Sequence, residues 1–526
     1  MPAYRSAPAD FADPRRWWAL GALTLAVLAV GLDGTVLSVA LPTLARQLHA
    51  SESQLQWFSS GYLLVLGAAM LPAGLIGDRY GRKRTMLTAL ALFGVGSAAC
   101  AAAPSSAAFI AARTLLGLAG AGVIVMALSA LTVMFSEAER PKAVGVWAAA
   151  NFLALPIGPI LGGWLLSHYW WGWVFLMNVP VAALGLVAGW ALIPESRAPR
   201  RPKLDAVGTV ASAAGLAVLT FGLIEAGQHG WGDPGALAEM GAGLALIIAF
   251  FGWERRLGRT PGAEPLVDPA LFRSRSYTWG VVLAAVGVLA MVGVLFTMPQ
   301  YFQGVLGTDA MGSGLRLLPL IGGLVVAALP ADRLAARLGA KVTVTIGFTV
   351  LAAGLGLGAA TGVGSGGAYV AVWMALVGAG IGLALATTTS LALSELPEER
   401  SGIGSAVLQA LNKTAAPLGT AVLGSVLSAG YLARLQLAGL PSAAAAAVRE
   451  SVFGAVAVAQ AAHSPLLLTT SRAAFVHGMD LALTVSAAVA IAGAVLTVVF
   501  LPQARRPATL QDSAGVHSRV GIAPGG

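Results

Sequence analysis

An aspartate lies inside the first long apolar stretch of the chain. The run from Trp17 to Pro42 carries one charged residue, Asp33. A helix of about 20 apolar residues covers the hydrocarbon core of a bilayer, so this stretch is long enough to span a membrane. An ionised carboxylate there costs roughly 2.5–3.5 kcal/mol, unless protonation, ion pairing or a water-filled cavity removes the cost. Such a group can couple protons to movement. The alternative is an aspartate near the outer end of the helix, where its side chain reaches water.

A second ionisable residue, Arg113, lies in the apolar stretch 109–122. A guanidinium keeps its proton, so inside a membrane it needs an acceptor or water. If the stretches that carry Arg113 and Asp33 both line a cavity, Arg113 competes with the proton for the carboxylate. Protonation and substrate binding would then exclude each other. The alternative is an arginine whose side chain extends to the outer interface.

Further polar residues interrupt later apolar stretches. Lys413, with Gln409 and Asn412 beside it, falls well inside a span and is expected to line a cavity or to pair with a carboxylate. Glu225 lies near the outer end of its span, where it either attracts cations or caps the interface. Arg316 is expected to anchor its helix at the outer face.

The chain carries no recognisable enzyme motif. A phosphate-binding GxxxxGK[ST] loop, CxxC and HExxH are all missing, and the six histidines are scattered. The single cysteine, Cys100, excludes an intrachain disulfide. We therefore expect no catalytic residues, no metal and no cofactor, with a proton gradient as the energy source.

The elements that hold these residues are predicted to be membrane-spanning helices. The 526 residues are 57% hydrophobic and 10% charged, whereas soluble domains carry about 25% charged residues. Apolar runs between polar breaks predict about fourteen spans, and Ser51 with Gln54 predicts a capping box before the second. The spans lie near 17–41, 56–76, 85–103, 107–134, 142–166, 173–193, 206–226, 236–253, 278–302, 313–330, 342–360, 368–393, 402–430 and 475–501.

Most of the 32 Lys and Arg residues fall in loops on one side of these spans. By the positive-inside rule that side is the cytoplasm, and it includes both chain termini. Basic loops that face the anionic inner leaflet also explain the net charge of +9 without nucleic acid as a partner. The Ala-rich segment 431–473 is expected to form an external helical hairpin, because a further span there would place Arg505 and Arg506 outside.

Asp-Arg followed by spaced basic residues occurs twice, at 77–84 and at 331–341. Matching loops of this kind indicate two duplicated bundles with a site between them near the membrane midplane. The predicted fold is an all-α polytopic membrane protein with two six-helix bundles and an inserted central helix pair. Its predicted parts are an N-terminal bundle (1–193), the inserted pair with its linkers (194–276), a C-terminal bundle that includes the external loop (277–501) and a cytoplasmic tail (502–526).

The first of these loops has the composition of a conformational latch. Its glycines let two helix ends approach closely, and its aspartate can pair with a basic residue of a neighbouring helix end. Such a pair breaks when two bundles rock apart, so it can stabilise one conformer. A plain positively charged cytoplasmic loop is the alternative. The residues concerned are Gly74, Gly77, Asp78, Arg79, Gly81 and Arg82.

Several stretches occur in the order typical of one transporter family. They are LDGTVLSVALP (32–42), GDRYGRKR (77–84), WWGWVFLMNVP (170–180), MPQYFQGVLG (298–307) and GIGSAVLQALNKTAAPLG (402–419). Together they resemble the major facilitator superfamily, and within it the fourteen-helix drug–proton antiporters that export quaternary ammonium compounds and other drugs. In related transporters the arginine at the position of Arg113 is followed by a Gln-Gly pair, whereas here Leu116 precedes Gly117.

The fifth predicted span contains a run that resembles the antiporter motif of that family. Its glycines allow close packing against a partner helix, which we expect to come from the other bundle. Its second proline removes a backbone donor and bends the helix. A tight seam there would oppose leakage through the empty carrier, although close packing without a role in coupling is the alternative. The motif residues are Gly145, Pro156, Gly158, Pro159, Gly162 and Gly163.

The resemblance implies proton-coupled export of a lipophilic or cationic small molecule, such as a drug or an antibiotic, by alternating access. We expect a monomer in a bacterial cell membrane. The alternatives are a dedicated exporter of one antibiotic or metabolite and a proton-coupled importer. From a different class, a receptor that does not transport or a lipid scramblase would use the same fold. The sequence does not identify the substrate.

Overall fold

The computed structural model consists of long helices that run side by side. Across the described part of the chain every regular element is a helix, which confirms the predicted all-α class. The helices follow one another in the predicted order, with most predicted spans inside an observed helix or helix pair. The structure describes residues 15–135, 139–197, 205–260, 269–394, 398–437 and 440–502.

Seven helices form the first part of the chain. The predicted capping box at the start of the second is confirmed, because the Gln54 backbone N–H donates to Ser51 Oγ and the Ser51 N–H donates to Gln54 Oε1 at 3.1 Å. The predicted sixth span consists of two helices. The bounds are α1 Arg15–Gln47, α2 Glu52–Tyr80, α3 Arg82–Ala101, α4 Ser106–Met134, α5 Arg140–His168, α6 Trp173–Leu176 and α7 Asn178–Leu192.

The later helices are interrupted more often. A π-helical turn, η2, continues α10, and two helices, α11 and α12, occupy the predicted span 313–330. The bounds are α8 Ala206–His229, α9 Pro234–Leu257, η1 Pro269–Arg273, α10 Arg275–Gln300, η2 Tyr301–Val305, α11 Ala310–Arg316, α12 Leu318–Ala328, α13 Ala331–Leu338, α14 Ala340–Gly358, α15 Gly367–Ser394, α16 Glu398–Arg434, α17 Ser442–Glu450, α18 Val452–Ala461 and α19 Pro465–Phe500.

Twelve helices within the described ranges are long and apolar enough to cross a membrane. A thirteenth is α2, if the segments on either side of its 47° bend between Met70 and Pro72 count as one span. A proline inside a helix removes a hydrogen bond and favours such a bend. The predicted fifth span coincides with α5, which is 29 residues long but is not among these thirteen. The predicted number of fourteen spans therefore stays a prediction.

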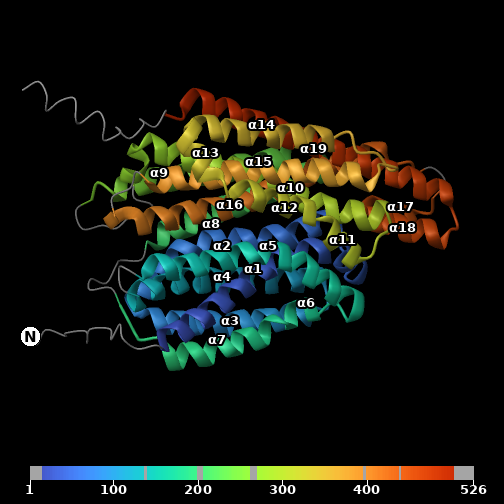
Figure 1. The fold of residues 1–526 in the computed structure, drawn as a ribbon. Helices are drawn as coiled ribbons and strands as arrows, with labels where there is room; N and C mark the ends of the chain where they lie inside the picture. The colour runs from blue at the N-terminus through green and yellow to red at the C-terminus, as the bar shows by residue number, and fades with distance from the viewer. Residues whose placement is uncertain are drawn as a thin grey trace, which may run out of the picture.

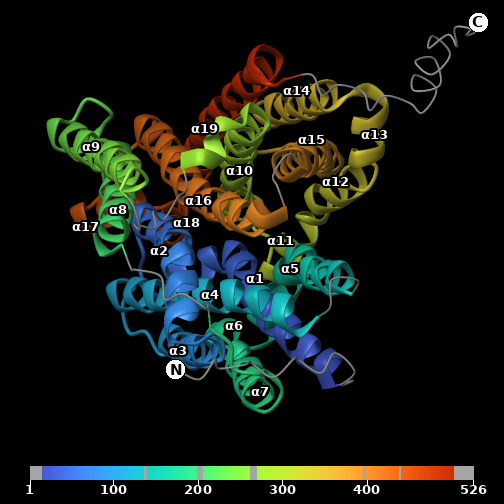
Figure 2. The same ribbon diagram turned by 90° about the vertical axis from the view of Figure 1, so that its left-hand side faces the viewer.

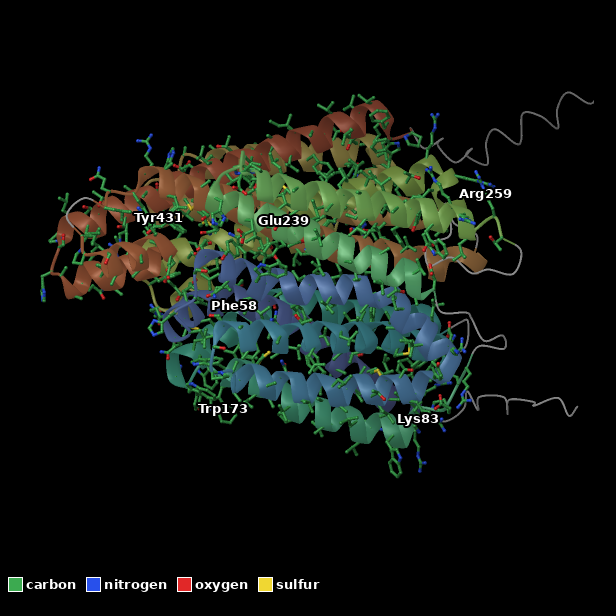
Figure 3. The ribbon with its side chains drawn as sticks, turned by 180° about the vertical axis from the view of Figure 1, so that it is seen from behind. Phe58, Lys83, Trp173, Glu239, Arg259 and Tyr431 are labelled. Carbon is green, nitrogen blue, oxygen red and sulfur yellow. The ribbon has the colours of Figure 1, made fainter. Side chains whose placement is uncertain are left out.

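The helices form two bundles that lie against each other. Helices α1–α7 make one bundle, and helices α10–α16 with α19 make the other (Figure 1). Viewed along the helices, the two bundles face each other across a seam between α2 and α16 on one side and between α5 and α11 on the other (Figure 2). Lys83 and Arg259 lie at one end of the molecule and Trp173 and Tyr431 at the other (Figure 3). We call these the Lys83 end and the Tyr431 end.

The inserted pair, α8 and α9, lies beside the seam. Helix α8 packs on α2 and on α16, whereas α9 packs on α8 at the periphery (Figure 2). Gln228 Nε2 donates to Ser428 Oγ at 3.1 Å, and the Ser425 hydroxyl donates to the Leu223 carbonyl. The pair therefore bridges the two bundles. Residues 198–204 and 261–268 of its predicted linkers, and 503–526 of the predicted tail, lie outside the described residues.

The two predicted matching loops share a backbone feature. Gly81 joins α2 to α3 with φ 121°, and Gly339 joins α13 to α14 with φ 90°. Residues with a Cβ rarely adopt this left-handed region, so glycine is needed at both turns. Equivalent turns at equivalent places in the two bundles support the predicted duplication.

The segment 431–473 contains two short helices, α17 and α18, which lie at the Tyr431 end (Figure 1). The last span begins earlier than predicted, at Pro465 instead of near 475. Ser464 caps it by accepting a hydrogen bond from the Leu467 N–H, and a proline at the first helical position favours a helix start. The hairpin is therefore shorter than expected, and its external location stays a prediction.

Candidate functional site

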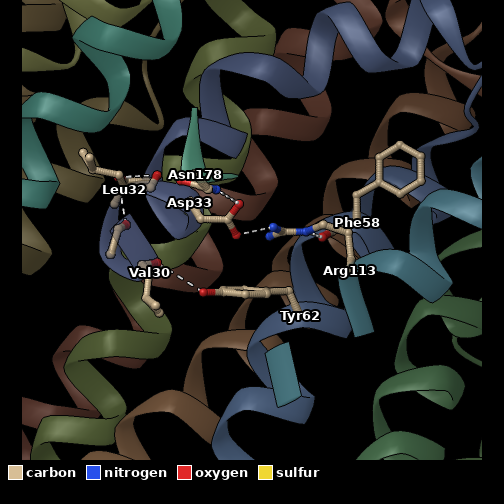
Figure 4. Close-up of polar contacts among 9 residues, drawn as sticks. Val30, Leu32, Asp33, Phe58, Tyr62, Arg113 and Asn178 are labelled. Atoms are coloured by element: carbon tan, nitrogen blue, oxygen red, sulfur yellow. Dashed lines mark hydrogen bonds and ion pairs between the residues drawn. The ribbon is translucent and has the colours of Figure 1, made fainter. Parts of the chain in front are cut away.

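Asp33 lies in the interior of the first bundle with two hydrogen-bond donors on its carboxylate. Its side chain has 0% exposure and that of Arg113 has 1%. Arg113 Nη1 lies 2.5 Å from Asp33 Oδ2, and Asn178 Nδ2 donates to Asp33 Oδ1 at 3.2 Å (Figure 4). Neither charged side chain reaches an interface, so the alternative of residues extending to the outer surface is wrong for both.

The arginine is held on three sides. Its Nε donates to the Phe58 carbonyl at 3.2 Å, and its guanidinium carbon lies 4.1 Å from the centre of the Tyr62 ring. The Tyr62 hydroxyl in turn donates to the Val30 carbonyl at 3.2 Å (Figure 4). A guanidinium over an aromatic face gains cation–π stabilisation. The cluster thus joins α1, α2, α4 and α7.

Sequence reasoning missed Asn178 and Tyr62. Both side chains are neutral, and a neutral side chain costs little free energy inside a membrane helix. Their positions in the sequence therefore do not stand out, whereas the charge of Asp33 does. Asn178 lies at the start of α7, directly after the break that follows α6. It belongs to the stretch 170–180 that carried part of the family resemblance, and this was the one available signal for it.

The antiporter motif packs against both bundles. A Cβ on Gly158 would collide with the Thr35 side chain, and one on Gly162 would lie 2.7 Å from Val36 Cγ1. These two glycines therefore contact α1 of the same bundle, not the other bundle as expected. Thr35 Oγ1 also donates to the Ala154 carbonyl at 2.9 Å, which ties α1 to α5.

The end of the same motif reaches the second bundle. A Cβ on Gly163 would lie 2.8 Å from the Ala310 carbonyl oxygen and from Met311 Cα, and one on Gly314 would collide with the Pro159 carbonyl. The backbones of α5 and α11 thus touch where both residues are small. Gly145 and Pro156 lie in the part of α5 whose side chains are outside the described residues.

The predicted latch residues lie at the Lys83 end, at the end of α2 and the start of α3. Asp78 pairs with Arg82, with Oδ1 2.8 Å from Nη2 and 2.9 Å from Nε, and so links the end of α2 to the start of α3. Arg79 lies over the Tyr80 ring at 5.6 Å. Gly74 faces Val125, and Gly77 faces Met126 so closely that a Cβ would collide.

The same loop also contacts the end of the first bundle's last helix. A Cβ on Gly81 would lie 2.6 Å from a Glu195 carboxylate oxygen, and the Arg82 N–H donates to the Ser196 carbonyl at 2.9 Å. Lys83 Nζ donates to the Trp190 carbonyl at 2.6 Å. All these partners belong to the first bundle, so a role in holding the two bundles together stays a prediction.

The remaining predicted residues are spread over three helices. Lys413, Gln409 and Asn412 lie together on α16, close to its contact with α2. Glu225 pairs with His229 at 2.8 Å along α8, and the Arg316 Nη1 donates to the Gly312 carbonyl at 3.3 Å. Glu225 and Arg316 are therefore not brought together with the α16 residues.

Direct polar contacts cross the seam near the Tyr431 end. Gln303 Nε2 donates to the Val39 carbonyl at 3.1 Å, and Gln300 Nε2 donates to Glu52 Oε1 at 3.3 Å. Gln300, Gln303 and Glu52 are all buried. Sequence reasoning missed these contacts, because it placed Glu52 outside the second span. With Gly163 against α11, they close the seam at this end.

Comparison with known protein families agrees with this architecture. A model of the Major Facilitator Superfamily matches residues 23–420. The chain belongs to the Major Facilitator Superfamily. This confirms the predicted family, whose members are transporters and not enzymes.

Curated relatives cover nearly the whole chain. The chain is 34% identical to a tetracenomycin C resistance and export protein of Streptomyces glaucescens, over 93% of this chain and 92% of that protein. It is 32% identical to the multidrug efflux pump LfrA of Mycolicibacterium smegmatis, over 91% and 95%. It is 30% identical to the methyl viologen resistance protein SmvA of Salmonella typhimurium, over 89% and 95%. The first two of these names state export or efflux, and the third states resistance to methyl viologen.

Solved structures share the fold. A bacterial homolog of the human lysosomal transporter Spinster superposes with a TM-score of 0.64 at 16% identity, over 93% of this chain and 98% of that one. A D-xylose–proton symporter superposes with a TM-score of 0.59 at 15% identity, over 93% and 98%. At this identity the likeness establishes the fold alone. Among the described residues there is no group of His, Cys, Asp or Glu side chains that could hold a metal ion.

Proposed function

We propose that this chain is a proton-coupled secondary exporter of lipophilic drugs or antibiotics, and that Asp33 exchanges a proton as the carrier alternates. The observation that carries the proposal is the buried Asp33 carboxylate, bonded to one cation and one amide, in a chain whose relatives export drugs. The basic loops support a bacterial inner membrane location with the Lys83 end in the cytoplasm.

Asp33 cannot take up a proton without changing its partners. Both of its oxygens accept hydrogen bonds, from Arg113 and from Asn178. A neutral carboxyl would leave the Arg113 charge uncompensated in a dry interior, which costs several kcal/mol. Protonation therefore favours a rearrangement in which Arg113 reaches water or another acceptor, and proton loss restores the pair.

A route connects this carboxylate to the seam. Asp33 faces α4, whereas Thr35, two residues later and so about 200° around the helix, faces α5. Helix α5 packs closely on α1 at Gly158 and Gly162, and it contacts α11 of the other bundle at Gly163. A shift of α1 on protonation would therefore move α5 and its contact with the second bundle. Packed helices transmit such shifts because close packing leaves few intermediate arrangements.

Alternating access then couples proton uptake and release to the transport of the substrate. The described conformer has polar and backbone contacts across the seam at the Tyr431 end. Protonation of Asp33 and occupation by substrate would favour opposite conformers, so an inward proton gradient would drive export. Import driven by the same gradient is the competing direction.

The test is transport in vesicles from an efflux-deficient bacterial host. In inverted vesicles an imposed pH gradient should drive uptake of a drug to which the wild type confers resistance. Asp33→Asn should insert normally and lose at least about tenfold of this uptake, because its amide cannot exchange a proton. Equal gradient-driven uptake by Asp33→Asn would contradict the proposal. Accumulation in right-side-out vesicles under an inward proton gradient would instead assign import.

A further inference from the structure

Lys413 lies inside a membrane helix and has no counter-ion among the residues that the structure describes. It lies 15 residues from the start of α16 and is partly buried. None of the five ion pairs of the described residues includes it, and its ammonium group has no hydrogen-bond acceptor among them. A lysine ammonium offers three donors and no acceptor, so its interior position is costly unless an acceptor arrives.

The helix register directs Lys413 toward the space between the two bundles. Helix α16 faces α2 of the first bundle through Thr414 and Gly424, and it faces α10 of its own bundle through Gly419 and Leu423. At about 100° per residue, position 413 falls between these two faces, on the side away from α8. Lys413 therefore points into the seam and not toward lipid.

Polar groups beside Lys413 extend the same surface. Gln409 lies one turn earlier on the same stripe of α16 and is partly buried. The neighbouring Asn412 has a buried Oδ1 that receives no hydrogen bond. The stripe thus combines the positive charge of Lys413 with the amide donor of Gln409, whereas Asn412 lies about 100° away on the face toward α10. A positive charge beside an amide donor suits a group with a negative oxygen.

Two buried carboxylates of the described residues, Asp33 and Glu52, have other partners. Asp33 is bonded to Arg113 and Asn178, deep in the first bundle. Glu52 bonds to Gln300 and lies one turn from Gln56, which packs against Gly424. Gly424 is 11 residues from Lys413, or roughly 16 Å along α16. Neither of these carboxylates reaches Lys413, so within the described part of the chain an acceptor from outside the protein is the one that would satisfy its ammonium group.

We propose that Lys413, together with Gln409, binds the acidic group of the exported compound, so that the substrate class is a lipophilic organic acid with a carboxylate or phenolate. This deepens the proposed function and rests on it, because the ligand of the seam is taken to be the transported compound. It replaces the expectation of a cationic substrate: the buried Asp33 has its own cation, and the charge left facing the seam is positive.

The experiment measures binding to the full chain, purified and placed in phosphatidylcholine nanodiscs. The probes are 2-naphthoate and 2-naphthamide, which share one ring system and differ in charge. The wild type should bind the acid at least about tenfold more tightly than the amide, since hydrogen bonds to a charged group are the stronger kind. Lys413→Gln should remove this preference and leave amide binding unchanged, whereas Lys413→Arg should keep it.

Arg316→Gln is the matched control, because it removes a positive charge whose hydrogen bond is made within α11. It should leave the preference for the acid intact. Equal binding of acid and amide by the wild type, or equal weakening of both by Lys413→Gln, would overturn the proposal. A preference that disappears when phosphatidylglycerol is added to the nanodiscs would overturn it too, since the anion would then be a lipid headgroup. Binding needs no proton gradient, so this result is independent of the transport test of Asp33→Asn.

Discussion

Asp33 and Arg113 are 80 residues apart in the sequence and form a buried ion pair in the structure. An ion pair in a dry interior adds little net stability, because the loss of hydration offsets most of the attraction. Removing one partner is a different matter, since a single buried charge is left behind. The pair is therefore better suited to switching than to stabilising the fold.

Arg113→Gln should destabilise the protein by about 3–5 kcal/mol, because Asp33 would remain buried without a cation. The double variant Asp33→Asn with Arg113→Gln should recover part of this loss, since no charge is then left unpaired. Thermal unfolding of the purified variants in one detergent measures both effects. A double variant that is no more stable than Arg113→Gln alone would show that the two side chains do not depend on each other.

Charged residues in apolar stretches could be found from sequence because their cost is high and their number small. Asp33, Arg113 and Lys413 stood out for that reason. Tyr62 and the Phe58 carbonyl could not be found this way, because an apolar or neutral residue in a membrane helix carries no such cost. The packing of α2 against α4 decides which groups contact the Arg113 guanidinium, and the sequence pattern does not reveal that packing.

Helix α5 is the element that connects the proton site to the seam. Its Gly158 and Gly162 contact α1, and its Gly163 contacts α11. The contacts fall within two turns, and the adjacent residues Gly162 and Gly163 face different helices, so one helix touches both bundles. Small residues permit this approach of backbones, which is the main attraction between helices in a membrane.

Gly163→Leu should open the seam at the Tyr431 end, because its side chain would meet Ala310 and Met311. Overpacking of this kind costs about 1–3 kcal/mol in the closed conformer. A cysteine at Gln303, which is buried at this end, reports the change by its labelling with a membrane-impermeant maleimide in cells.

Labelling of the Gln303→Cys thiol should increase in Gly163→Leu and stay unchanged in the control Gly21→Leu. Gly21 also lies in a membrane helix, but a Cβ there meets nothing within 4 Å. Equal labelling of the Gln303→Cys thiol with and without Gly163→Leu would show that α5 does not hold this end closed.

Helix positions were largely predictable, because length and apolarity decide whether a segment can span a bilayer. The residues at which helices begin and end were less predictable. The start of α19 lies near 465, where Ser464 and Pro465 make a local cap that the apolar pattern does not reveal. The partners of Gly158 and Gly162 were assigned to the wrong bundle, whereas Gly163 does contact the other bundle as expected, since periodicity indicates a close contact but not which helix makes it.

At the scale of the whole molecule, the two bundles touch through few kinds of contact. Backbone contacts at glycines join α5 to α11 and α2 to α16, and α8 spans the seam from outside. Contacts between backbones with small side chains can separate and re-form without unpairing buried charges. Asp33 and Arg113 pair within one bundle, Glu52 accepts a neutral amide donor from across the seam, and Lys413 faces the seam without an ion pair among the described residues.

The central claim is that one carboxylate in the first helix exchanges its proton for substrate. The direct measurement is proton release when a transported drug is added to the purified protein in weakly buffered detergent solution, across about pH 5–8. The wild type should release protons on binding, and Asp33→Asn should bind the drug without release. Release by Asp33→Asn equal to that of the wild type, or no release by the wild type at any pH tested, would contradict the account.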